Sequence, residues 1–236
     1  MTELIFGEKE ENFIPDSGAL VYCPSSPCLI KIKADGKSDA LFSLLKKYDG
    51  RRILSDTLCT PPSGFKVKKY SLYTCKNVII GREISGSVKV TENEDVLPLI
   101  TSMYEESTGN TLSSSQAQQL FGNEKRNVWL WSDGGLCALI RIAFVGQHSA
   151  RINTLYTVKE KRGHGYASAL VYSVSRMLNE MGLCVTVLAD NENPASNKTY
   201  QSLGFVKKAD VFEYMPDASA PLHSALTYFT DLELPL

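Results

Sequence analysis

The chain has 236 residues, of which 43% are hydrophobic and 22% are charged, a composition typical of globular proteins. Lys and Arg total 25 against 26 Asp and Glu, so the formal net charge is -1. This balance gives the whole chain no attraction to nucleic acid or to an anionic membrane, and no apolar run approaches the length of a membrane-spanning helix. We therefore expect a cytoplasmic protein that binds neither, and in which any anion site is local.

The six cysteines are scattered, and most lie in apolar runs typical of reduced core thiols. Cys23 and Cys28 have a spacing that could supply two metal ligands. A structural zinc site needs two more ligands, and no second Cys/His pair exists in the sequence. We therefore expect no metal.

Residues 1–80 are predicted to form an α/β region of unknown role. Its helix is predicted from its apolar spacing, with Ser38 as N-cap and Gly50 after its end. The region carries no chemical motif, and its predicted boundary lies within Asn77–Gly86. The predicted elements are strands at Ala19–Tyr22 and Leu29–Lys33, a helix at Ser38–Tyr48, and strands at Arg52–Leu58 and Lys66–Cys75.

Residues 81–236 are predicted to form a second domain in the order β-α-α-β-β-β-α-β-α-β. The predicted strands are Ser87–Val90, Asn127–Trp131, Leu136–Val145, Arg151–Val158, Leu183–Ala189 and one beginning at Phe205. The predicted helices are Asp95–Glu106, Ser115–Leu120, Tyr166–Met181 and Ala195–Leu203.

A glycine loop, Arg162-Gly163-His164-Gly165-Tyr166-Ala167-Ser168, joins a predicted strand to the long helix. Glycines at such a turn let backbone N–H groups converge on an anion, and the helix N-terminus adds partial positive charge. The loop is not a Walker sequence. A dinucleotide fingerprint would need glycine at Ser168, although Asp190 after the next strand could serve as a ribose partner and keeps that alternative open.

Two motifs in this half resemble those of the GNAT superfamily of N-acetyltransferases. Motif A, (R/Q)-x-x-G-x-(G/A), is filled by Arg162, Gly165 and Ala167. Motif B, N-x-x-(S/A)-x-x-x-Y-x-x-x-G-F, is filled by Asn193-Pro-Ala-Ser-Asn-Lys-Thr-Tyr200-Gln-Ser-Leu-Gly-Phe205. The amino-acid sequence around motif A is similar to that of two-domain members, including predicted bacterial acetyltransferases and the glycine N-acyltransferase-like group.

The resemblance implies a GNAT fold, with a mixed, largely antiparallel central sheet flanked by helices. In two-domain members the N-terminal half is often a degenerate copy of this fold, and residues 1–80 could be such a half. The resemblance also implies binding of acetyl-CoA. The strand would offer backbone groups to the pantetheine arm, the loop would hold the pyrophosphate, and Asn193 would contact the pantetheine or cysteamine end. The implied cofactor-binding residues are Leu155, Tyr156, Thr157, Arg162, Gly163, His164, Gly165, Tyr166, Ala167, Ser168 and Asn193.

Tyr200 matches the family tyrosine that protonates the departing CoA thiolate, and we expect it to be the catalytic acid. The alternative is a packed aromatic on a helix face. No residue is an obvious general base, because the aligned positions carry Arg151 and Leu188. Substitutes would be Glu192, Asp190 and His148, although each more often serves a structural or solvated role. Cys184, in an apolar strand, is rejected as a nucleophile.

The expected reaction is acetyl transfer to a primary amine, carried by a small molecule, a peptide N-terminus or a lysine. A different class of protein, a catalytically silent CoA-binding module, is the alternative, because a silent module would need no base. The sequence does not identify the acceptor.

Overall fold

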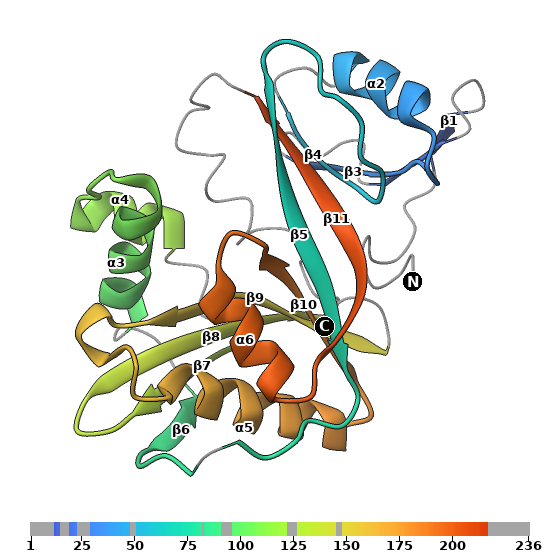
Figure 1. The fold of residues 1–236 in the computed structure, drawn as a ribbon. Coiled ribbons are helices and arrows are strands. Elements are labelled where there is room, and N and C mark those ends of the chain that lie inside the picture. The colour runs from blue at the N-terminus through green and yellow to red at the C-terminus, as the bar shows by residue number, and fades with distance from the viewer. Residues whose placement is uncertain are drawn as a thin grey trace.

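The computed structural model describes residues 12–14, 19–22, 29–47, 51–81, 83–90, 96–121, 127–144 and 148–216. Their strands form one mixed sheet of eleven strands in the order β1-β2-β3-β4-β11-β5-β10-β9-β8-β7-β6, with helices packed against it (Figure 1). The strands are β1 (Asn12–Ile14), β2 (Ala19–Tyr22), β3 (Leu29–Lys33), β4 (Arg52–Ser55), β5 (Phe65–Cys75), β6 (Ser87–Val90), β7 (Val128–Ser132), β8 (Leu136–Phe144), β9 (Ser149–Thr157), β10 (Cys184–Asp190) and β11 (Val206–Pro216). The helices are α2 (Ser38–Lys47), α3 (Leu97–Thr108), α4 (Ser114–Phe121), the 3-10 helix η2 (Lys159–Lys161), α5 (Tyr166–Glu180) and α6 (Pro194–Ser202).

The mixed sheet flanked by helices confirms the predicted fold class, and the boundaries of most predicted elements agree with those observed to within a few residues. The first helix of the second half was predicted from Asp95, which lies outside the described residues. The observed helix α3 begins at Leu97 with a proline in its first turn, where the missing N–H costs nothing. The three-residue strand β1 was not predicted, because so short a segment carries no readable periodicity.

Helices cover both faces of the sheet around β7, β8 and β9. Ala138 and Ile140 of β8 belong to the buried cluster beneath α5 and α6. Leu139, between them, belongs to the cluster beneath α3 and α4. Successive strand residues point to opposite faces, so the near-continuous apolar run of β8 supplies both clusters. A third cluster lies under α2, where Leu41 and Leu45 are joined by Phe212 and Tyr214 of β11.

Strand β5 lies between β11 and β10, so strands from both sides of the predicted boundary at Asn77–Gly86 belong to one sheet (Figure 1). It pairs antiparallel with β11 along nearly its whole length, and with β10 from Tyr70 to Cys75. Strand β11 also pairs with β4. A strand from the N-terminal half is therefore an internal member of the sheet that carries the second half. The division into residues 1–80 and 81–236 stays a prediction, and this pairing makes the two parts depend on each other.

A buried ion pair joins the same strands. Glu213 of β11 is 1% exposed, accepts a hydrogen bond from Arg52 Nη2 of β4, and accepts another from Tyr70 Oη of β5 at 2.8 Å. Removing one partner of a buried pair leaves the other charge buried.

We expect Glu213→Ala to lower the free energy of unfolding by about 3–5 kcal/mol, measured by urea denaturation. Asp210→Ala is the matched control on the same strand. Its side chain is 33% exposed in its ion pairs with Lys69 and Lys207, so its loss should cost about 1 kcal/mol or less. Equal effects of the two variants would contradict the assigned role of Glu213.

Candidate functional site

Strands β9 and β10 separate part-way along their length. Their parallel pairing covers only Ser149 to Ile152 of β9. The next residue, Asn153, is the extra residue of a bulge, because Ile152 pairs with Ile142 while Thr154 pairs with Arg141. A bulge bends its strand. Beyond it, β9 stays paired with β8 and β10 stays paired with β5 as far as Asp190, which leaves an opening between residues 153–157 and 188–190.

Two of the three predicted pantetheine-binding residues present their backbone to this opening. Val158 N–H donates to Cys137 O at 3.0 Å, which makes Thr157 a non-hydrogen-bonded partner of Ala138 on β8. The N–H and C=O groups of Thr157, and of Leu155 two positions earlier, therefore point away from β8. The backbone of Tyr156 points toward β8, and its side chain joins the cluster beneath α3.

The predicted phosphate loop lies between η2 and α5, at one end of the opening. Gly163 has φ 81° and Gly165 has φ 87°, in the left-handed region that favours glycine. Gly165 is the N-cap of α5 and makes no side-chain cap hydrogen bond, and the first turn has no acidic residue. The amides of Tyr166, Ala167 and Ser168 have no acceptor within the helix. The N-terminus of a 15-residue helix is a favourable position for an anion, and Gly165, Ala167 and Ser168 are partly exposed there.

The start of α5 is fixed by Tyr166. Its ring is buried, and its hydroxyl donates to Asp133 Oδ2 at 2.8 Å in the turn between β7 and β8. Ser85 Oγ donates to the same oxygen at 2.7 Å, and the two bonds lower the pKa of Asp133. The exposed His164 ring stacks on Tyr166 at 5.8 Å between centroids. The side chain of Tyr166 is therefore an anchor, and only its backbone N–H is placed for a ligand.

A carboxylate from α3 meets the other end of the loop. Glu106 Oε1 accepts a hydrogen bond from Tyr156 Oη at 2.8 Å, and Oε2 accepts one from Arg162 Nη2. Arg162 Nε also donates to Thr157 O at 3.1 Å. The bonds from Arg162 and Tyr156 lower the pKa of Glu106, whereas burial and the carboxylate raise the pKa of Tyr156 to about 12. Glu106 was not predicted from the sequence. It precedes Tyr156 by 50 residues and Arg162 by 56, and no local pattern links positions so far apart.

Comparisons with known proteins find the same fold in solved structures. Residues 134–214 match the family model described as FR47-like protein. A conserved protein of unknown function from Staphylococcus epidermidis aligns with a TM-score of 0.59 at 13% identity, covering 90% of this chain and 95% of its own. A GNAT-family protein from Novosphingobium aromaticivorans gives 0.56 at 18% identity, covering 89% and 91%. The chain has the GNAT fold.

A GCN5-related N-acetyltransferase-like protein from Streptococcus suis gives a TM-score of 0.53 at 14% identity, covering 84% of this chain and 83% of its own. No curated protein matches the chain. Residues 77–236 make up about 68% of the chain, so alignments that cover 84–90% of it include part of the segment before Asn77.

The segment that resembles motif B begins in the turn between β10 and α6 and continues through α6. Asn193 is the N-cap of α6, and its Oδ1 accepts a hydrogen bond from Ser196 N at 3.0 Å. Asn197 Nδ2 donates to Asp190 O at 2.6 Å and to Asn193 O at 2.9 Å, and its Oδ1 accepts from Tyr73 Oη at 3.0 Å. The asparagines therefore fix α6 at the end of the opening, and the predicted contact of Asn193 with pantetheine stays a prediction.

Tyr200 lies on α6 in the core cluster and is 2% exposed. Its ring packs against Phe205 at 5.4 Å and Tyr73 at 6.4 Å between centroids. Burial raises the pKa of the phenol, and a hydrogen bond with Ser196 lowers it by a smaller amount. The phenol therefore stays protonated at neutral pH. The packing fits the alternative of a packed aromatic, and the role of proton donor stays a prediction.

The three substitutes for a general base are respectively ion-paired, exposed and distant from the loop. Asp190 forms an ion pair with Lys68 at 2.6 Å and accepts from Glu192 N at 2.9 Å. Glu192 is exposed on that turn. His148 precedes β9 at the end opposite the loop, roughly 30 Å from Thr157 at the rise of an extended strand.

The described ranges contain no helix long and apolar enough to cross a bilayer. They also contain no cluster of three or more His, Cys, Asp or Glu side chains that could hold a metal ion. Cys23 and Cys28 lie outside those ranges, as does the C-terminal segment from Asp217.

Proposed function

We propose that the protein is an acetyl-CoA-dependent N-acyltransferase that transfers an acetyl group directly to a primary amine, on a small molecule, a peptide N-terminus or a lysine. The observation that supports this best is the opening between β9 and β10, which ends at the uncapped N-terminus of α5. The end of the opening at α5 can hold an anion, and the unpaired edge of β9 can hold an extended chain that contains amides.

The residues present fit CoA. The amides at the start of α5 suit a pyrophosphate, and the added Cβ of a side chain at Gly163 would meet no atom within 4 Å, so the outer surface of the loop is accessible. Leu155 has its N–H and C=O turned to the opening, and Thr157 has its N–H turned there while its C=O accepts from Arg162 Nε. The free groups suit the amides of pantetheine. Acetyl-CoA, when bound, supplies a thioester carbonyl activated toward nucleophilic attack.

The acceptor amine must be neutral to attack, and the thiolate that leaves must be protonated. We assign the second task to Tyr200. A phenol near pKa 10 gives up its proton to a thiolate of pKa near 8.5 only when it is held close, and burial opposes release further. Hydrogen-bond donation to the developing thiolate is the form of acid catalysis that this environment favours. No described side chain is assigned as the base.

A second candidate is a CoA-binding module that transfers nothing. It is favoured by the burial of Tyr200 and by the ion pair that engages Asp190. Release of free CoA thiol in the presence of a panel of amines separates the two. Saturable binding of CoA by calorimetry, with no thiol released from acetyl-CoA by any amine, would establish the module instead of the enzyme.

The loop assignment is tested by a matched pair of substitutions at Gly163. Asn and Asp both tolerate positive φ and differ by one charge, and the site has space for either. A unit charge about 6 Å from a phosphate costs about 3 kcal/mol at an effective dielectric constant of about 20, and solvent screening reduces this to about 1 kcal/mol. We expect Gly163→Asp to bind CoA about tenfold more weakly than Gly163→Asn, measured by isothermal calorimetry. Equal affinities would remove the pyrophosphate from this loop.

A further inference from the structure

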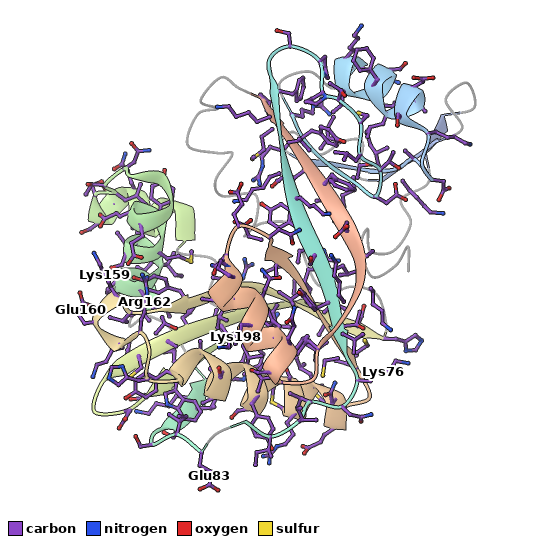
Figure 2. All side chains as sticks on the ribbon, in the orientation of Figure 1. Lys76, Glu83, Lys159, Glu160, Arg162 and Lys198 are labelled. Carbon is purple, nitrogen blue, oxygen red and sulfur yellow. The ribbon has the colours of Figure 1, made fainter. Side chains whose placement is uncertain are left out.

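Glu106 uses both carboxylate oxygens on one side of the phosphate loop. Tyr156 Oη and Arg162 Nη2 each bind one oxygen, and Arg162 Nε binds Thr157 O. The guanidinium also lies over the Tyr156 ring, 5.6 Å from its centroid. Its donors are thus directed to α3 and to the end of β9. Figure 2 shows Arg162 with Lys159 and Glu160 beside α3, where the chain leaves β9.

This arrangement fixes the turn that leads into the loop. Three amides of the turn are hydrogen-bonded: Val158 N to Cys137 O, Lys161 N to Val158 O, and Arg162 N to Lys159 O. The last of these is long, at 3.4 Å, so the backbone bond alone holds Arg162 weakly. The fork of the guanidinium adds two contacts, one to the strand end and one to a different helix.

We propose that Glu106 is a positioning residue for the phosphate loop: it acts through Arg162, and it links the helix α3 to the affinity for CoA. The inference rests on the proposed function for its ligand. It goes beyond that function because it assigns a role to a residue outside both sequence motifs.

The sign of the effect distinguishes this role from simple electrostatics. Glu106 places a negative charge near a site for a dianion, so removing that charge should by itself tighten CoA binding. If Glu106 instead positions the phosphate loop through Arg162, its loss should weaken CoA binding. Glu160 is the matched control, because it is exposed on η2 and close enough to influence the pKa of Tyr156. The ion pair of Arg162 is with Glu106.

The experiment compares Glu106→Gln, Glu160→Gln and Arg162→Lys in the full chain. We expect the affinity for CoA to fall by about threefold to tenfold in Glu106→Gln, as for a half-exposed charged pair, and by a similar factor in Arg162→Lys, because an ammonium lacks the fork. Glu160→Gln should bind CoA equally or more tightly. In turnover, Glu106→Gln should raise KM for acetyl-CoA and leave kcat within twofold.

Hydrogen exchange of the free protein gives a second measurement that does not need CoA. The amides of Val158, Lys161 and Arg162 should exchange about threefold to tenfold faster in Glu106→Gln, and at the wild-type rate in Glu160→Gln. If the wild type fails to bind CoA, the proposed function is wrong, and the exchange rates still decide whether Glu106 orders the turn. Unchanged exchange, or tighter CoA binding in Glu106→Gln, overturns the inference.

Discussion

A fragment of residues 77–236 is expected not to fold, although it contains both sequence motifs. It lacks β5, which lies between β11 and β10 in the sheet. Leu72 of β5 is fully buried, and Tyr73 and Cys75 are 3% and 2% exposed. Burial of such side chains contributes about 1.5–3 kcal/mol each, which approaches the whole stability of a typical domain. Thermal unfolding by circular dichroism should show no cooperative transition.

The control fragment begins at residue 61 and differs only by retaining β5. It should recover a cooperative transition, at a lower melting temperature than the full chain, because Phe212 and Tyr214 lose the cluster under α2 and Glu213 loses its ion pair with Arg52. A folded 77–236 fragment that binds CoA with wild-type affinity would show that the second half is independent of β5.

Tyr200→Phe is expected to lower kcat by roughly 10²- to 10⁴-fold while leaving the affinity for acetyl-CoA within twofold, if the phenol protonates the leaving thiolate. The ring remains, so the contacts with Phe205 and Tyr73 persist. Loss of the hydroxyl's bond with Ser196 should cost about 1 kcal/mol of stability. Stopped assays of thiol release and urea denaturation measure the two effects separately.

Tyr172→Phe on α5 is the matched control. Its ring packs against the same core cluster, and we expect it to leave kcat unchanged. Wild-type turnover in Tyr200→Phe would show that Tyr200 is only a packed aromatic residue. The leaving thiolate would then be protonated by water.

Much of the fold could be predicted because the signals are local. Glycines at positions 163 and 165 take positive φ, and Asn193 caps α6 within three residues of itself. Apolar periodicity set the type of most elements, although it could not reveal β1 or how far β9 pairs with β10. The contact of Asn193 was predicted for the cofactor, whereas the observed bond is to the backbone of its own helix, a competition between local and ligand partners that the sequence does not resolve.

The sequence by itself determined the strand, glycine loop and helix that make an anion site, because turn chemistry and helix capping act over a few neighbouring residues. Only the tertiary structure decided that β5 enters the sheet of the second half, that Leu155 and Thr157 face an opening, and that Glu106 meets Arg162. These features depend on strand register, on a bulge and on pairs far apart in the chain. Such contacts are selected by the packing of the whole sheet, and no short segment of the sequence specifies them.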